Sequence, residues 1–354
     1  MPPLGYGGVE SVVSLLTERL VRRGHDVTLF AAPGSRSTAT VHHALSEGHP
    51  DEIERALYEA DHVARVFAVL DQAGEGGAPF DVVHDHCGFT ALAMADRIGV
   101  PMVHTLHGPF TPETGRFYAA HGHKATLVAI SEAQRSSAPA GVAVAGVVAN
   151  PVDVADWPFE PCKQDYLLWL GRMHETKGPH RAIRAAREAG CPLVLAGPVQ
   201  AGQEAFFRDV VAPAIDGTTV RYVGEVGGQV KADLIAGARA LLMPIRWNEP
   251  FGMVMVEALA CGTPVISFDE GAAGEIVDDG VTGFLVDDEA AMAAAVTGLA
   301  GIDPRICRDA VMARFGVDGV ASAYERLYHG AAAANGGAGA VIDLTGGARR
   351  RALR

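Results

Sequence analysis

The chain has 354 residues, of which 49% are hydrophobic and 20% are charged. This length exceeds what one ordinary hydrophobic core needs and suits two soluble domains. The 42 acidic and 29 basic residues give a formal net charge of −13, which argues against non-specific binding to nucleic acid. No apolar run approaches the roughly 18 residues of a membrane span, and no signal-peptide pattern opens the chain. The five cysteines are scattered, as in cytosolic proteins, so we expect a cytoplasmic location.

In the first half of the chain, strand-like runs alternate with amphipathic helical patterns, which is typical of parallel α/β layers. The predicted helices are Val9–Arg23, Asp51–Gln72 and a short one that Ser131 caps. The predicted strands are Asp26–Ala31, Val82–His84, Pro101–Thr105 and Ala125–Ile130. A doubly wound domain normally begins with its central strand, whereas here Met1-Pro2-Pro3 leads directly into a glycine turn and a helix. We therefore expect the first strand of this domain to be missing.

The second half repeats the same alternation. Its predicted strands are Tyr166–Leu170, Pro192–Ala196, Thr219–Val223, Ala240–Ile245 and Thr263–Phe268, with helices between them. Three prolines between Pro151 and Gln164 indicate a linker. The predicted organisation is an N-terminal Rossmann-like domain (residues 1–153), a C-terminal one (154–312), a helix that packs back across the hinge (313–330) and a disordered Ala/Gly-rich tail (331–354).

The segment from Glu249 to Val265 carries the strongest chemical signal. Glu249 follows a predicted buried strand, and Glu257 lies on the second turn of the predicted helix Gly252–Cys261. Both carboxylates are then expected to face the crevice where open α/β sheets bind ligands. The free N–H groups of Phe251, Gly252 and Met253 would bind an anion at the start of this helix. Carboxylates accept hydrogen bonds from hydroxyls and amides donate to phosphates, so the segment predicts a sugar-nucleotide site.

Two cations follow the first predicted strand of the second half. Arg172 and Lys177 stand in GRMHETKG, directly before the predicted helix His180–Ala189. Such residues are commonly only solvated, but at the end of a strand they can neutralise a diphosphate, to which Arg can donate two bonds. Because no acidic DxD motif lies near this position, we expect the two cations to replace a divalent metal ion.

The first half offers a glycine loop and a histidine cluster. Gly7 and Gly8 begin the first helix, where bare amides can approach a ligand, although an ordinary turn would look the same. His107 ends a predicted strand. Zinc is an alternative for the cluster of His84, His86, Cys87, His104 and His107, since His84 and His86 share one face of a strand. We disfavour the zinc interpretation because all five residues fall at strand ends, where parallel α/β folds bring loops together with or without a metal.

Taken in order, seven segments between residues 5 and 330 resemble retaining glycosyltransferases of the GT-B fold, family 4, whose mark is two glutamates separated by seven residues. The resemblance implies two facing Rossmann-like domains. It implies catalytic roles for Glu249, His107, Arg172 and Lys177, and donor binding by the two glycines, both cations, both glutamates and residues 251–253. Glu249 would hold sugar hydroxyls and Glu257 the ribose diol. By the same resemblance, Glu275 would lie near the nucleotide and Tyr222–Val226 would line the nucleobase pocket.

The reaction implied by this resemblance moves a sugar from a nucleotide-diphosphate sugar to an acceptor hydroxyl with retention of configuration, without a metal or cofactor. The expected partners are the nucleotide sugar and a hydroxylated acceptor (a glycan, a lipid or a small molecule); nucleic acid is excluded, and peripheral membrane association is left open. A phosphorylase would need a pyridoxal-binding lysine segment that is not evident, and epimerases of this fold lack the EPFG segment. A degenerate or truncated sugar-nucleotide-binding protein remains the alternative, because the first strand is missing.

Overall fold

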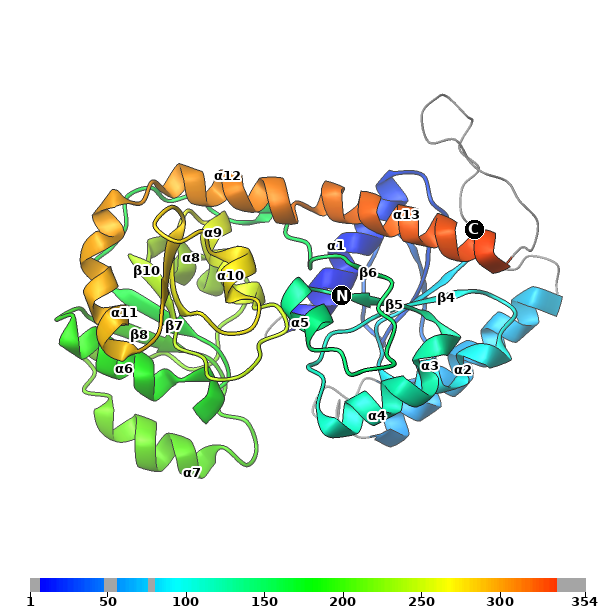
Figure 1. Ribbon diagram of the computed structural model, residues 1–354, viewed down its shortest axis with the longest axis horizontal. Helices are drawn as coiled ribbons and strands as arrows, with labels where there is room; N and C mark the ends of the chain where they lie inside the picture. Colours follow the sequence, from blue (N-terminus) through cyan, green and yellow to red (C-terminus); the bar gives the residue numbers. More distant parts are fainter. Residues whose placement is uncertain (1–6, 48–55, 76–79, 336–354) are drawn as a thin grey trace.

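The computed structural model describes residues 7–47, 56–75 and 80–335, which form two α/β bodies (Figure 1). Every pair of neighbouring strands in these residues is parallel. The α/β fold with two parallel, Rossmann-like halves is therefore as the sequence predicts.

The second half contains a six-stranded sheet in the order β12-β11-β10-β7-β8-β9. Its strands are β7 (Leu167–Leu170), β8 (Leu193–Ala196), β9 (Val220–Tyr222), β10 (Ala240–Met243), β11 (Val265–Phe268) and β12 (Gly283–Val286). Most are continuous apolar runs buried on both faces, as expected for a covered parallel sheet. The strand order reverses between β7 and β10, so the crevice at their carboxyl ends is the expected ligand site.

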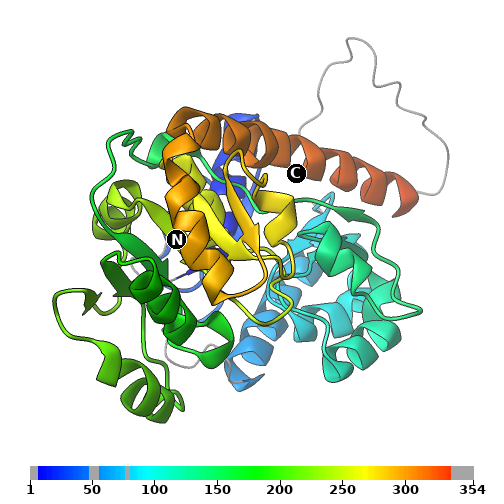
Figure 2. The same ribbon diagram turned by 60° about the vertical axis from the view of Figure 1, so that its left-hand side comes forward.

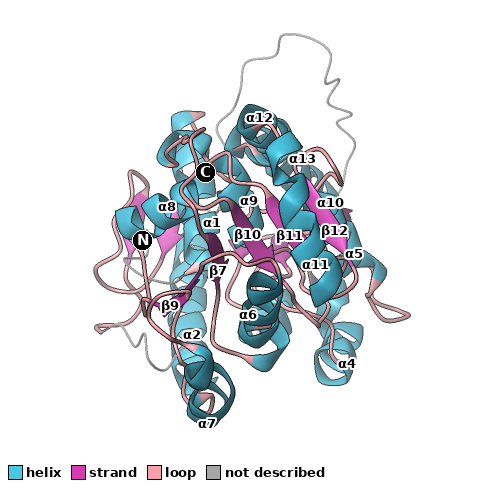
Figure 3. Cartoon of the chain, turned by 90° about the vertical axis from the view of Figure 1, so that its left-hand side faces the viewer, coloured by secondary structure: helices cyan, strands magenta, loops and turns pink. Residues whose placement is uncertain are grey.

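Helices cover both faces of this sheet (Figure 3). They are α6 (Pro179–Glu188), α7 (Glu204–Phe206), α8 (Gly228–Gly237), α9 (Met253–Ala260), α10 (Ala273–Ile276), α11 (Glu289–Ala295) and α12 (Pro304–Phe315). Alternate strand residues divide between two cores: Leu168 packs in the core that includes α9 and α12, whereas Leu167 packs in the core that includes α6 and α11. The sheet is thus a buried middle layer.

The first half holds two separate sheets, β1-β2 and β3-β4-β5-β6. Their strands are β1 (Thr28–Phe30), β2 (Thr40–His42), β3 (Val83–Asp85), β4 (Met102–Thr105), β5 (Thr126–Ala129) and β6 (Gly146–Val147). The helices are α1 (Gly8–Arg22), α2 (Ala56–Glu75), α3 (Phe89–Met94), α4 (Pro112–His121) and α5 (Glu132–Ser136). Among the described residues no strand joins β1 to β3, which is where a central first strand would lie.

Two predictions differ from the structure in detail. The long helix predicted over 51–72 is described only from Ala56, and it continues to Glu75. The last helix, α13 (Val317–Asn335), runs five residues into the segment predicted as a tail. The remainder of that segment lies outside the described residues.

Helix α13 leaves the second half and lies along the first (Figures 1 and 2). Its Val320, Tyr324 and Tyr328 share a core with Leu16 of α1 and Val128 of β5. Val152 joins the α12–α13 junction by two backbone hydrogen bonds, to the carbonyl of Phe315 and from the amide of Val317. The chain therefore crosses between the halves a second time at this point.

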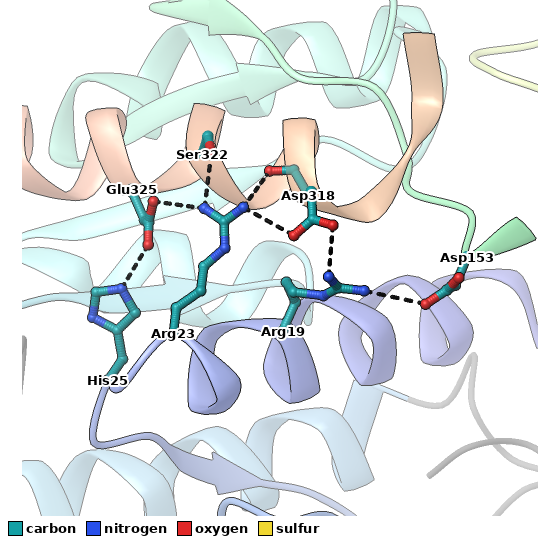
Figure 4. A network of polar contacts seen from close by, with 7 residues as sticks. All are labelled: Arg19, Arg23, His25, Asp153, Asp318, Ser322 and Glu325. Carbon is teal, nitrogen blue, oxygen red and sulfur yellow. Dashed lines mark hydrogen bonds and ion pairs between the residues drawn. The ribbon is translucent and has the colours of Figure 1, made fainter. Parts of the chain in front are cut away.

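A polar network fastens α13 to α1 (Figure 4). Arg19 forms ion pairs with Asp153 and Asp318, at 3.2 and 2.6 Å. Arg23 contacts Asp318 and Glu325, and it also donates to the hydroxyl of Ser322. His25 Nε2 lies 2.9 Å from Glu325. A network in which charges share partners contributes more to stability than isolated surface ion pairs do. These contacts therefore attach α13 to the first half along its own length.

Candidate active site

Glu249 is held in the loop between β10 and α9 by its backbone. Its carbonyl accepts from the amide of Ala272 at 3.0 Å. Gly271, at φ +57°, comes so close that a Cβ there would lie 2.4 Å from this same carbonyl oxygen. Only glycine permits that approach. The loop after β11 therefore fixes the position from which the buried Glu249 side chain projects.

The Glu249 carboxylate is paired with donors from two other side chains. Lys177 forms an ion pair with Oε2, and the Trp247 indole N–H donates to the same oxygen at 3.0 Å. The Lys177 ammonium also lies 4.4 Å from the Trp247 ring centroid, in cation–π contact. Burial lowers the pKa of Lys177, and the charge of Glu249 opposes that shift. Lys177 and Glu249 thus act as one coupled unit, which their spacing of 72 residues in the sequence did not reveal.

Arg172 makes fewer polar contacts than Lys177, the other predicted cation. Its Nη1 donates to Gln200 Oε1 at 3.2 Å, whereas its buried Nε has no hydrogen-bond partner among the described residues. A buried guanidinium N–H without a partner is costly. This donor is therefore available to an anion that enters the site.

Helix α9 presents both an anion site and a carboxylate. Gly252, its N-cap residue, has a left-handed φ of 96°, and the helix begins at Met253. Glu257 is buried on the second turn, where Lys231 of α8 lies 2.7 Å from its carboxylate. Lys231 also lies 5.4 Å from the ring of Trp157. Lys231 was not predicted as a site residue, because no local sequence pattern marks a lysine that reaches another helix.

The first half faces α9 with its glycine loop and His107. A Cβ at Gly8 would lie 3.8 Å from Met253 Cγ, so the start of α1 is next to the start of α9. His107 Nε2 lies 2.9 Å from His86 Nδ1. Burial lowers the pKa of His107 to about 4, so its imidazole is neutral at pH 7. This arrangement leaves His107 as a neutral hydrogen-bonding group at the edge of the crevice.

All the residues predicted to act in catalysis or to bind the donor line one cavity of about 1620 Å³. They are Gly7, Gly8, His107, Arg172, Lys177, Glu249, Phe251, Gly252, Met253 and Glu257. Lys231 and Trp247 line it as well. Residues separated by as much as 250 positions are therefore brought to a single crevice between the two halves.

Glu275 lies at the boundary between the two halves, and its proximity to the nucleotide stays a prediction. It is not among the residues that line the cavity. Its carboxylate accepts from the backbone amides of Glu132 and Ala133, at 2.8 and 2.6 Å, at the N-terminus of α5. Ser131 caps α5 as predicted, and its hydroxyl also donates to the carbonyl of Pro250 at 2.6 Å. These contacts make Glu275 part of a polar bridge between the two halves.

Tyr222–Val226 likewise contribute no residue to the cavity lining. The Tyr222 hydroxyl donates to the carbonyl of Gly197 at 2.8 Å. That this segment lines a nucleobase pocket stays a prediction.

The histidine cluster is organised by hydrogen bonds. His104 Nδ1 lies 2.6 Å from Asp85, while the two ring nitrogens of His84 face the Tyr328 and Thr105 hydroxyls at 2.7 and 2.8 Å. In the part of the chain that the structure describes, no group of three or more His, Cys, Asp or Glu is placed to hold a metal ion. The zinc alternative therefore has no geometric support there.

None of the described helices is both long and apolar enough to cross a bilayer.

The fold and this site define a class of transferase that uses a nucleotide sugar. Two family models match the chain: Glycosyltransferase Family 4 over residues 6–156, and Glycosyl transferases group 1 over residues 158–300. A D-inositol 3-phosphate glycosyltransferase from Frankia alni is 30% identical over 335 residues, covering 79% of this chain and 82% of that protein. The chain belongs to the family 4 glycosyltransferases, which transfer a sugar from a nucleotide sugar.

Solved structures agree on the fold. AviGT4, a glycosyltransferase involved in avilamycin A biosynthesis, is 28% identical, with a TM-score of 0.69 over 95% of this chain and 93% of that one. Anabaena Alr3699/HepE in complex with UDP-glucose is 21% identical, with a TM-score of 0.69 over 93% of this chain and 97% of that one. The GT-B architecture is therefore shown along nearly the whole chain.

Proposed function

We propose that this enzyme moves a hexosyl group from a nucleoside-diphosphate sugar to an acceptor hydroxyl with retention of anomeric configuration and without a divalent metal. The observation that carries the proposal is the shared cavity, where Arg172, Lys177 and the start of α9 meet the carboxylates of Glu249 and Glu257. Cations and helix amides suit a diphosphate, and carboxylates suit hydroxyls.

Each group then has one task in donor binding. The free Nε of Arg172 and the amides at the start of α9 donate to the diphosphate. Glu257 accepts from the ribose diol while it shares the charge of Lys231. Glu249 accepts from the sugar hydroxyls and shares Lys177 with the incoming phosphate. Each ion pair thus holds its carboxylate in position for the donor.

In the transfer step, negative charge grows on the departing β-phosphate. Arg172, Lys177 and the Gly252 amide stabilise that charge. Their attraction to the phosphate is stronger in the transition state than in the bound donor, because more negative charge is present there. The β-phosphate oxygen takes the proton of the acceptor hydroxyl, which attacks from the same face of the sugar. His107 is neutral, so it forms a hydrogen bond with the donor sugar without adding a charge to the site.

The test begins with a donor panel in a thermal-shift assay, followed by NMR of the product. UDP-glucose is the first donor to try because Alr3699/HepE was solved with it, and an inositol phosphate is the first acceptor because of the Frankia alni relative. An α-linked product from an α-donor supports retention, and a β-linked product refutes it.

Arginine variants provide the matched pair for this test. Arg172→Ala is expected to lower kcat/KM by about 100-fold or more, since one donor to a developing oxyanion contributes that much. Arg187→Ala removes an exposed guanidinium that contacts only the carbonyl of Ala214 among the described residues, and it should leave kcat/KM unchanged. Equal effects of the two substitutions would contradict the role of Arg172.

A donor-binding protein without activity is the second candidate. One observation favours it: the sheet of the first half is divided between β1 and β3, whereas the six-stranded sheet that carries most donor-binding residues is whole. Stabilisation by a donor, with neither transfer nor hydrolysis for any acceptor tried, would select this candidate.

A further inference from the structure

Trp247 is a cavity residue that has no task in the transfer steps proposed above. It lies in the loop between β10 and α9, two residues before Glu249, and its half-buried side chain lines the cavity. The amide of Glu249 donates to the carbonyl of Trp247 at 2.8 Å, which closes a three-residue turn. This turn brings the indole close enough to the Glu249 carboxylate for a direct hydrogen bond.

The loop of Trp247 also lies against the loop that carries Lys177. The amide of Arg246 donates to the carbonyl of Thr176 at 2.9 Å, so the residues that follow these two are neighbours through the backbone. The guanidinium of Arg246 pairs with Glu270 at 3.0 Å, which keeps this nearby cation on a different carboxylate. The backbone therefore places the indole next to the Lys177 side chain.

The indole contacts both members of the Lys177–Glu249 pair. Its N–H donates to Oε2 of Glu249 at 3.0 Å, and its ring centroid lies 4.4 Å from the Lys177 ammonium. Lys177 pairs with the same Oε2 atom. Among the described residues, no donor lies on Oε1 of this carboxylate. Two donors fill the two lone-pair positions of Oε2, so Oε1 is the oxygen left to accept from a ligand.

We propose that Trp247 is a positioning residue that sets which oxygen of Glu249 faces the donor sugar. Rotation of the carboxylate would break both bonds to Oε2, so the indole and the ammonium together hold Oε1 toward the cavity. This assignment rests on the proposed function, in which Glu249 accepts from the sugar hydroxyls. Trp247 itself acts through Glu249 and takes no part in the transfer.

The ring has a second effect, which concerns the charge of Lys177. Burial lowers the pKa of Lys177, because a low-dielectric environment penalises the ammonium form. The negative face of an aromatic ring attracts a cation, so Trp247 and Glu249 both favour the charged form of Lys177. The indole N–H therefore serves the sugar end of the donor through Glu249, whereas the ring serves the diphosphate end through Lys177.

Two substitutions separate the N–H from the ring. Trp247→Phe keeps an aromatic face for Lys177 but has no donor for Glu249, whereas Trp247→Gln keeps a donor but has no ring. UDP and UDP-glucose are the probes in isothermal titration, because only the second carries a sugar. Trp247→Phe should weaken UDP-glucose about 5-fold or more and leave UDP unchanged. Trp247→Gln should weaken both probes equally, by about 2- to 5-fold.

A purely structural role for Trp247 would give a different pattern, in which both variants lose affinity for both probes to the same extent. That result would overturn the proposal, and so would a Trp247→Phe protein with unchanged affinity for UDP-glucose. Trp157→Phe is the matched control. Trp157 is not among the described residues that line the cavity, and phenylalanine keeps an aromatic face toward Lys231. Both affinities should stay as they are in the unmodified protein.

The indole N–H signals of the ¹⁵N-labelled protein test the contact without a donor. The chain has three tryptophans, and Trp247→Phe identifies the signal of Trp247 by its loss. Glu249→Gln replaces a charged acceptor by a neutral one, so this signal should move upfield, whereas Glu188→Gln should leave it unchanged. A signal that Glu249→Gln does not move would overturn the proposal. Failure of UDP-glucose to bind the unmodified protein, with the signal shift intact, would instead count against the proposed function.

Discussion

Replacing Glu257 by alanine is expected to weaken donor binding about 10- to 150-fold. The side chain of Glu257 is 9% exposed, and the residue lines the cavity. If it accepts from the ribose diol, its loss removes hydrogen bonds to a charged group that contribute about 1.5–3 kcal/mol in total. Binding should fall without a comparable loss of maximal rate, because the ribose lies away from the bond that breaks.

The fold should survive this substitution. Lys231 loses its ion-pair partner, but 24% of its side-chain surface remains exposed, so water can solvate the ammonium. We expect a stability cost of about 1 kcal/mol, well below that of stranding a fully buried charge. Urea unfolding of the variant measures this cost independently of ligand.

Isothermal titration with the nucleoside diphosphate of the stabilising donor provides the assay. Glu188→Ala, which removes an exposed carboxylate at the end of α6, is the control and should bind as the unmodified protein does. Lys231→Met, alone and combined with Glu257→Ala, completes a double-mutant cycle for the pair. A folded Glu257→Ala protein with unchanged affinity would refute the assignment of Glu257 to the ribose.

Four further outcomes are expected. Transfer should continue in EDTA because Arg172 and Lys177 supply the positive charge; loss of activity that Mg²⁺ or Mn²⁺ restores would show that this reasoning is wrong. Limited proteolysis should cut first between residues 1 and 150, where the sheet is divided, and equal resistance of both halves would contradict this. Glu275→Ala removes the acceptor for two amides of α5 and should increase the radius of gyration in solution scattering, whereas Glu275→Gln, which keeps an acceptor oxygen, should increase it less. The pKa of His107 is about 4 in the folded protein and near 6.5 when unfolded, so the unfolded chain takes up the proton first. Stability should therefore fall as the pH drops from about 6.5 to 4, and it should fall less in His107→Gln when both are followed by urea unfolding.

The sequence by itself determined the layer architecture and most elements of the second half. Runs such as Leu167–Leu170 and Ala240–Met243 are apolar at every position, so burial on both faces of a parallel sheet is their natural state. The start of α9 at Gly252 could also be predicted, because a glycine can adopt the left-handed conformation that precedes this apolar helix. In contrast, the edge strands β2 and β12 escaped prediction. β2 has only three residues, one exposed and two half-buried, and β12 begins at Gly283 with three half-buried residues after it, so neither shows the fully buried apolar run of a central strand.

Only the tertiary structure decided how the charges of the site are paired. Lys177 with Glu249 and Lys231 with Glu257 are contacts over 72 and 26 residues, and Glu275 reaches α5 over 143. Local patterns fix which way a strand or helix presents its residues, but not which distant residue lies opposite.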